Sequence, residues 1–133
     1  DAANFLIGEN LLKGFLEGRD SGVWFRHSEN DLLLGPLNKK KLPSKPTKAV
    51  TLLIRAGDLM LCRCDASDPP DQNSWLGCID KINLYSTHIE IDCTGKGCYK
   101  VALSCAEWKD LHLEIGSPVR ISVDVDDIHV IPE

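Results

Sequence analysis

A set of apolar positions near the start of this chain returns near its end. The tract VTLLIRAGDLML (50–61) aligns with VRISVDVDDIHV (119–130) at a constant offset of 69 residues, with apolar residues superposed and one aspartate kept. A shorter pair precedes it, because ENLLKGFL (9–16) aligns with QNSWLGCI (72–79) at an offset of 63. One short supersecondary unit cannot bury its apolar face alone, so the pattern predicts two copies packed together.

Within each copy, apolar and polar residues alternate, and the alternating tracts are broken by Gly, Pro, Asn and Asp. This pattern predicts a mainly β protein. The expected strands of the first copy lie near 10–17, 22–27, 30–34, 49–55 and 59–64. Those of the second copy lie near 74–84, 86–93, 98–104, 118–124 and 127–132. Two five-stranded units of this kind predict two small OB-like barrel lobes.

One segment has the features of a helix. Ser104 precedes CAEWKDL (105–111) as an N-cap, and Glu107 lies three residues later, which completes a capping box. This helix falls in the stretch by which the second copy is about six residues longer. Between the strands, CTGKGC (93–98) predicts a hairpin, since Gly95 and Gly97 adopt positive φ at low cost.

The segment DASDPPDQN (65–73) is rich in turn residues and has no apolar period. It is expected to link a first lobe over 1–64 to a second lobe over 74–133. Whether the two lobes exchange strands is left open by the pattern.

Composition and charge limit the classes of function that the chain can have. The 133 residues are 43% hydrophobic and 26% charged, which fits one domain or two small lobes sharing a core. The net charge of −5 argues against a general nucleic-acid binder, which needs a basic excess. The lysines between 39 and 48 are expected to lie in a solvated loop. No stretch approaches the ~20 apolar residues of a membrane span.

The six cysteines lack the paired C-x-x-C spacing and the nearby histidines of a zinc site. Cys93 and Cys98 flank the TGKG turn, so a disulfide across the hairpin is one possibility. In the absence of a secretion signal the sequence favours reduced cysteines that act as small apolar residues.

Sequence motifs of catalysis are missing. The chain has no P-loop, no dinucleotide-binding glycine pattern and no nucleophile elbow, and its four histidines are scattered singly. This stretch of chain is therefore not expected to be an enzyme. Trp24, Trp75 and Trp108 are expected to fill the core or the lobe interface.

The second copy resembles the Mop repeat, a molybdopterin- and molybdate-binding module. That repeat has N-x-x-x-G near a first strand, Thr or Ser ahead of a short helix, L-x-L-x-x-G, and a last β-pair. The resemblance runs over 73–79 and 100–131, and the matching residues are Asn73, Gly77, Ser104, Leu111, Leu113 and Gly116.

The first copy resembles the transport-associated oligomer-binding (TOBE) region of ABC-importer ATP-binding subunits. The tracts of that region run FLG-x-E-N-x-L-x-G and I-R-P-E-D, and here they are FLIGENLLKG (5–14) and LLIRAGDLML (52–61). The two resemblances together cover nearly the whole chain. They favour the molybdate or tungstate importers, with iron, sulfate, polyamine and sugar importers as close relatives.

The resemblance implies a regulatory and oligomerisation domain that follows an ATPase domain located upstream of Asp1. The partners it implies are that ATPase domain, a second copy of this chain and, indirectly, the membrane subunits of a transporter. It also implies a cytoplasmic location at the inner face of the cell membrane. The ligand it implies is molybdate or tungstate, bound between two domains and without any other cofactor, so that binding and subunit geometry are coupled.

Carried over to this sequence, the oxyanion site of the family falls on Asn10, Arg55, Ala56 and Gly57 in the first copy, and on Asn73 and Ser104 in the second. Arg55 keeps a positive charge and Gly57 keeps a backbone amide open to close approach. Backbone amides at a turn or helix start suit a tetrahedral dianion. The matching turn of the second copy is Asp124–Val125–Asp126, whose carboxylates repel a dianion.

Two alternatives to an oxyanion-sensing domain of an importer stay open. One is a ligand-free dimerisation domain of another importer ATPase, which would dimerise without responding to oxyanions. The other is a free-standing molybdate-storage protein of tandem Mop repeats, which would bind several anions in each oligomer.

Overall fold

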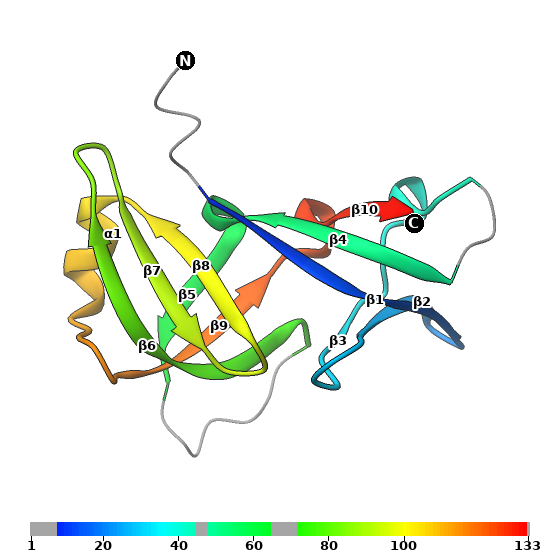
Figure 1. Cartoon of the computed structure of the whole chain (residues 1–133), viewed down its shortest axis with the longest axis horizontal. Coiled ribbons are helices and arrows are strands. Elements are labelled where there is room, and N and C mark those ends of the chain that lie inside the picture. Colours follow the sequence, from blue (N-terminus) through cyan, green and yellow to red (C-terminus); the bar gives the residue numbers. More distant parts are fainter. Residues whose placement is uncertain (1–7, 45–47, 65–71, 133) are drawn as a thin grey trace.

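The computed structural model describes residues 8–44, 48–64 and 72–132, and these residues form two curled antiparallel sheets of five strands each (Figure 1). The strands of the first sheet are β1 (Glu9–Arg19), β2 (Gly22–His27), β3 (Leu33–Leu34), β4 (Ala49–Arg55) and β10 (His129–Pro132). Those of the second sheet are β5 (Leu59–Arg63), β6 (Ser74–Leu84), β7 (Ile89–Thr94), β8 (Cys98–Leu103) and β9 (Pro118–Val123).

The described residues also form one α-helix and three short 3-10 helices. The helix α1 (Cys105–Leu111) connects β8 to β9. The 3-10 helices are η2 (Lys39–Lys41), η3 (Ala56–Asp58) and η4 (Val125–Asp127). The sheets and the single short helix confirm a mainly β protein with two OB-like lobes.

Each sheet takes its edge strand from the other copy of the repeat. The strand order is β10-β4-β1-β2-β3 in one sheet and β5-β9-β6-β7-β8 in the other. β5 ends the first copy yet pairs with β9, and β10 ends the second copy yet pairs with β4. The registers agree, since Leu61 lies opposite Ile121 and Val130 lies opposite Leu52. The two copies are therefore related by an approximate twofold symmetry, and each copy exchanges its last strand with the other.

The strands follow the hydrophobic pattern closely, with differences at three ends. The expected strand at 30–34 is reduced to Leu33–Leu34, because Asp31 has a positive φ of 56° and lies between a turn and the strand. The strand expected from 86 begins at Ile89, after a bend. The strand expected from 127 begins at His129, because η4 occupies the preceding residues. The expected linker lies mostly outside the described residues, and its role as a lobe boundary stays a prediction.

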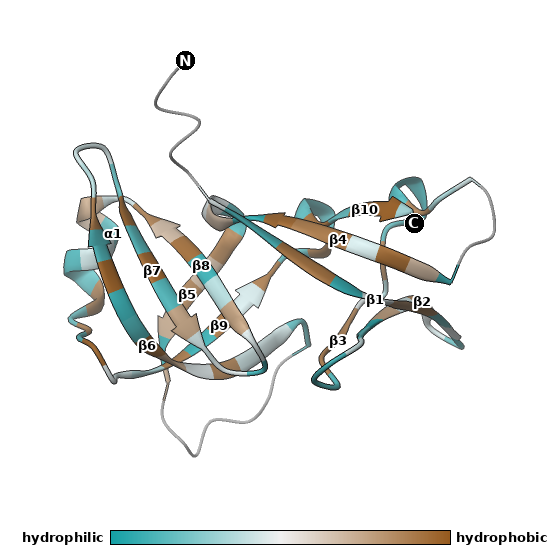
Figure 2. Ribbon diagram, viewed as in Figure 1, coloured by the Kyte–Doolittle hydropathy of each residue, from teal (hydrophilic) through white to brown (hydrophobic). Residues whose placement is uncertain are grey.

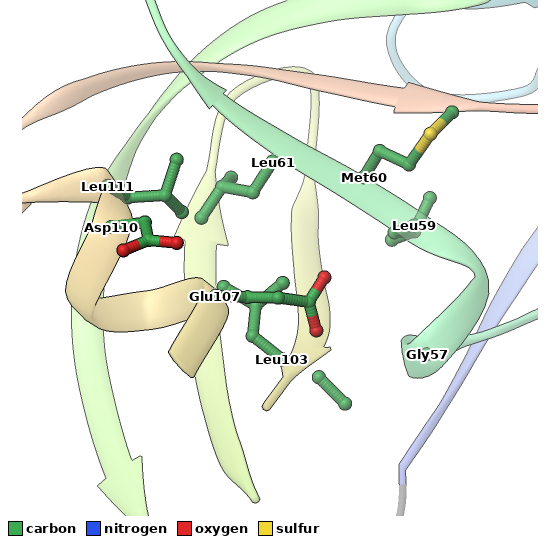
Figure 3. A pocket seen from close by; sticks show the side chains of 9 residues that line it. Gly57, Leu59, Met60, Leu61, Leu103, Glu107, Asp110 and Leu111 are labelled. Atoms are coloured by element: carbon green, nitrogen blue, oxygen red, sulfur yellow. The ribbon is translucent and has the colours of Figure 1, made fainter. Parts of the chain in front are cut away.

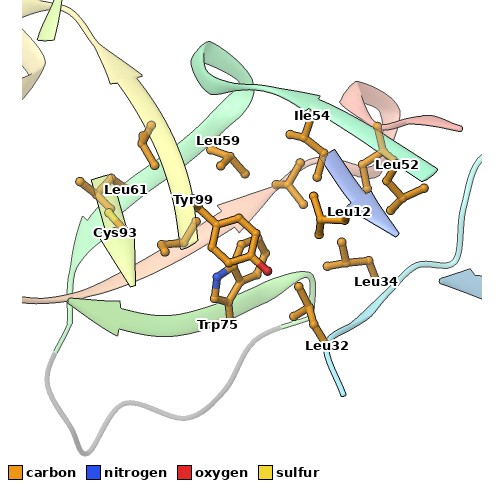
Figure 4. Packing of buried hydrophobic residues seen from close by; sticks show 14 of the residues in the cluster. Leu12, Leu32, Leu34, Leu52, Ile54, Leu59, Leu61, Trp75, Cys93 and Tyr99 are labelled. Carbon is orange, nitrogen blue, oxygen red and sulfur yellow. The ribbon is translucent and has the colours of Figure 1, made fainter. Parts of the chain in front are cut away.

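The two sheets share one apolar core. Hydrophobic and hydrophilic residues alternate along several strands (Figure 2). In β1, Asn10 and Leu12 are buried and their neighbours in the strand are exposed. The buried residues form a single cluster that includes Phe25 and Leu52 of the first sheet and Ile121 of the second. Trp75 lies at the junction, against Tyr99 with ring centroids 4.8 Å apart (Figure 4). Trp75 is 4% exposed, which confirms its predicted place in the core.

The glycine shared by the two first strands allows close packing. A Cβ on Gly14 would lie 2.1 Å from the carbonyl oxygen of Arg26 and 2.6 Å from the ring of Phe25. A Cβ on its counterpart, Gly77, would lie 2.6 Å from the carbonyl oxygen of Thr94. Backbone atoms cannot give way as a side chain can, so both motifs need glycine.

The described cysteines are free thiols. Cys93 is buried and lies opposite Tyr99, while Cys98 is exposed and lies opposite Thr94, so the two do not face each other across the hairpin. Burial raises the pKa of Cys93 to about 12. Among the residues described, no helix is long and apolar enough to cross a membrane, and no cluster of His, Cys, Asp and Glu is arranged to hold a metal ion.

Candidate functional site

Asn10, the first of the expected site residues, joins the two sheets. Its Nδ2 donates to the carbonyl oxygens of Ile54 at 3.2 Å and Lys100 at 2.9 Å, and its Oδ1 accepts from Lys100 N at 2.8 Å. Both hydrogens of the carboxamide are therefore used within the protein. Nearby, the buried carboxylate of Glu90 accepts from Gly8 N at 3.1 Å and lies 3.7 Å from the Lys100 ammonium.

Asn73 joins the sheets at the equivalent place in the second copy. Its Oδ1 accepts from Gly35 N at 2.8 Å, and the neighbouring Gln72 donates from Nε2 to the Gly35 carbonyl at 3.0 Å. Gly35 follows β3, and Lys100 lies in β8, the third strand of the other copy. Each copy therefore ties the start of its first strand to the third-strand region of the other copy. This role accounts for an asparagine in both motifs without any ligand.

The turn at 55–58, called here the Gly57 turn, leads from β4 into β5. Arg55 is exposed and is the N-cap residue of η3, without a side-chain hydrogen bond to the helix. Ala56 is fully buried, and its N–H donates to Gly8 O at 3.0 Å, which fixes the turn to the start of the described chain. Gly57 is exposed, and nothing lies within 4 Å of the position that its Cβ would occupy. A ligand can therefore approach the main chain closely at Gly57.

Ser104 caps α1 as the sequence predicts. Its Oγ accepts from Glu107 N at 3.1 Å, and Glu107 Oε1 accepts from Ser104 N at 3.0 Å, which forms a complete capping box. These hydrogen bonds, the one from the Ser104 backbone foremost, lower the pKa of Glu107 below its usual value. Glu107 is therefore a carboxylate at neutral pH.

Gly57, the start of β5, the end of β8 and one face of α1 line one pocket, which is called here the Gly57 pocket (Figure 3). It has a volume of about 400 Å³. Its lining residues are Gly57, Leu59, Met60, Leu61, Ala102, Leu103, Glu107, Asp110 and Leu111. Exchange of the last strands brings these segments together, because the turn belongs to the first copy and α1 to the second. Two of the lining residues are acidic and none of them is basic.

The equivalent turn of the second copy, 124–127, is called here the Asp126 turn, and its surroundings differ. Asp124 Oδ1 accepts from Asp126 N at 2.9 Å and so caps η4. Asp126 Oδ1 accepts from Asn38 Nδ2 at 3.0 Å. Asn38 in turn caps η2, since its Oδ1 accepts from Lys40 N at 3.0 Å. Asn73 lies beside this turn, because its carbonyl accepts from Val123 N at 3.1 Å.

The expected site residues thus separate into two places. Gly57 lines the same pocket as Leu103, which precedes Ser104, and Glu107, whose N–H donates to Ser104 Oγ, although the sequence assigns the two segments to different copies. Asn73 lies beside the Asp126 turn, because its carbonyl accepts from Val123 N. Asn38 is the residue that sequence reasoning misses: it caps η2 between β3 and β4, as Ser104 caps α1 between β8 and β9. The two copies differ in length at this point, so their alignment does not pair Asn38 with Ser104.

Comparison with known proteins gives matches in structure but not in sequence. No family model matches the sequence, and no curated protein matches it. Among solved structures, a crystal structure of ModG, described as a cytoplasmic molybdate-binding protein, superposes with a TM-score of 0.75. The match covers 93% of this chain and 96% of that chain at 13% sequence identity. The chain has the fold of ModG.

The likeness to ModG extends over both lobes, because it covers almost the whole of each chain. At 13% identity the likeness shows the fold alone, so the chemistry of the site must be argued from the residues of this chain. Those residues offer one open turn, at Gly57, and one turn whose donors are bonded to Asp124 and Asp126.

Proposed function

We propose that this chain is a Mop/TOBE-type regulatory domain that binds a tetrahedral oxyanion of the molybdate or tungstate class. The observation that carries the proposal is the two-lobed likeness to ModG over 93% of this chain, since the name of that protein states that it binds molybdate. The Mop-like and TOBE-like sequence tracts support the same class independently, because they rest on residues and not on the fold.

The oxyanion is proposed to bind at the Gly57 turn. A tetrahedral dianion needs several N–H or O–H donors in a small concavity. Gly57 leaves its main chain open to close approach, Arg55 supplies an exposed guanidinium, and Ser104 carries a hydroxyl at the start of α1. Ala56 is buried, and it holds the turn in place without reaching the ligand.

The carboxylates of Glu107 and Asp110 line the Gly57 pocket and repel an anion bound there. A dianion next to two carboxylates needs compensating positive charge. Arg55 supplies one cation, and we propose that a second copy of the chain supplies further donors across a dimer interface. A site shared in this way links the bound ligand to the arrangement of the subunits.

The proposed setting is the cytoplasmic end of an ABC importer, behind an ATPase domain upstream of Asp1, with the membrane subunits as indirect partners. The match to 96% of ModG supports a second candidate, a free-standing molybdate-binding protein. The acidic lining of the Gly57 pocket supports a third, a ligand-free dimerisation domain.

Titration calorimetry with molybdate, tungstate and sulfate, combined with sedimentation in the presence and absence of each anion, tests the proposal. Heat from molybdate or tungstate, lost in the variant Gly57→Asp, supports the proposed site. No heat from any oxyanion at millimolar concentration, with dimers that form regardless, overturns the ligand proposal and leaves a structural role.

A further inference from the structure

The two turns are equivalent by the repeat, yet their donors have different partners. The offset of 69 residues places Asp124 on Arg55 and Asp126 on Gly57. Strand exchange brings an N-cap region to each turn: Asn38 donates to Asp126, and Ser104 directly follows Leu103, which lines the Gly57 pocket together with Gly57. Each place thus combines a turn from one copy with a helix cap from the other.

At the Asp126 turn, the donors that correspond to a ligand site are already bonded to carboxylates of this chain. The N–H of Asp126, which corresponds to the N–H of Gly57, donates to Asp124 Oδ1 at 2.9 Å. The side-chain amide of Asn38, which occupies the place of Ser104, donates to Asp126 Oδ1 at 3.0 Å. One backbone donor and one cap donor therefore each hold a carboxylate oxygen, as they would hold an oxygen of a bound anion.

The Gly57 turn shows the opposite arrangement. Arg55, in the position of Asp124, makes no side-chain hydrogen bond to η3. Gly57, in the position of Asp126, has no side chain, and the space where its Cβ would lie is empty within 4 Å. The carboxylate of this turn belongs to Asp58, which corresponds by the repeat to Asp127, so the positions of Asp124 and Asp126 carry no carboxylate here.

We propose that Asp124 and Asp126 are a built-in substitute for the ligand, so that the second copy holds its own carboxylates where an oxyanion would bind. The chain therefore takes up one oxyanion, at the Gly57 turn, and the Asp126 turn keeps the bound arrangement whether or not the anion is present. This inference rests on the proposed oxyanion function. Two carboxylates also exclude a dianion from the second place by charge repulsion.

The test compares the number of tungstate ions bound per chain in the wild type and in the variant Asp124→Ala/Asp126→Gly, by native mass spectrometry and titration calorimetry. The variant removes both carboxylates and gives the second turn the open main chain of the first. Asp20→Asn/Asp80→Asn is the matched control, since it removes the same net charge from exposed positions in the β1–β2 turn and in β6.

We expect one ion per chain in the wild type and in the control, and two in the opened variant. If the opened variant binds the same number as the wild type, the inference is wrong while the oxyanion function stands. Binding by neither protein overturns both. If only the opened variant binds tungstate, the result supports the claim that carboxylates block the Asp126 turn. The same result contradicts binding at the Gly57 turn.

Circular dichroism and a thermal melt establish whether the double variant is folded. If it is not, Asp126→Gly alone replaces it, because this change still frees the Asn38 amide. A higher ion count than in the wild type then supports the inference, and an equal count overturns it.

Discussion

Asn10 and Lys100 exchange two hydrogen bonds across the junction of the two sheets. Asn10 Nδ2 donates to Lys100 O at 2.9 Å, and Lys100 N donates back to Asn10 Oδ1 at 2.8 Å. The side chain of Asn10 thus acts as an extra peptide group that pairs with the main chain of β8. It also holds Ile54 O, directly before the Gly57 turn. The geometry of that turn therefore depends on the junction between the lobes.

Replacing Asn10 by Ala is expected to lower the free energy of unfolding by about 3 kcal/mol, because it leaves buried main-chain groups without partners. Asn83→Ala is the matched control, since Asn83 makes one hydrogen bond to Glu90 O, at 3.2 Å, and its loss costs about 1 kcal/mol. Urea unfolding measures both. Equal losses for the two variants would show that the Asn10 bridge contributes no more to stability than a single hydrogen bond.

Replacing Gly14 by Ala is expected to cost about 3 kcal/mol or to prevent folding. The added Cβ would lie 2.1 Å from a backbone oxygen, so the strand pair itself must move. Gly18→Ala in the same strand is the control, because nothing lies within 4 Å of its Cβ position. That change is expected to be neutral within about 1 kcal/mol. Thermal melts of the two variants decide the matter, and a Gly14→Ala protein as stable as Gly18→Ala would contradict the packing described.

Much of the fold is predictable because its signals are local. Alternation in β4 and β9 and the Ser104–Glu107 capping box depend on residues close in sequence, and the structure has them where the sequence predicts them. The positive φ of Gly95 and Gly97 in the hairpin belongs to the same class.

Pairing between strands that are far apart in the sequence leaves no local signal in either strand. The residues of β5 are equally apolar whether the strand pairs within its own copy or with β9 of the other, so the sequence does not reveal the exchange. The same exchange decides that Leu103 shares a pocket with Gly57 and that Asn38 lies next to Asp126. The hydrogen bonds of Asn10 Nδ2 to the carbonyls of Ile54 and Lys100 are long-range in the same way, so no local pattern predicts them.

Cys93 is expected to resist thiol reagents in the folded protein. Its thiol is fully buried, and burial, then the charge of Asp92, raises its pKa to about 12. Only the thiolate reacts, and at pH 8 roughly one molecule in 10⁴ carries it. The exposed Cys98 is the internal control. Mass spectrometry after alkylation at pH 8 should find Cys98 modified and Cys93 intact, and modification of Cys93 at the rate of Cys98 would contradict its burial.

Removing a negative charge from the Gly57 pocket is expected to strengthen oxyanion binding. In Glu107→Gln the capping box persists, because glutamine serves equally at that position. Loss of the charge relieves about 1 kcal/mol of repulsion, or roughly a fivefold gain in affinity for molybdate. Glu114→Gln, an exposed change beyond α1, is the control. Calorimetry that shows the same gain for both variants would place the anion away from this pocket.

The position of the bound anion distinguishes the Gly57 turn from the Asp126 turn. Crystals grown with tungstate give an anomalous signal from tungsten that locates each ion without assumptions about the site. We expect one strong peak per chain at the Gly57 turn, within hydrogen-bonding distance of its main chain, and no peak at the Asp126 turn. A peak at the Asp126 turn, or none at the Gly57 turn in crystals soaked to saturation, would contradict this expectation.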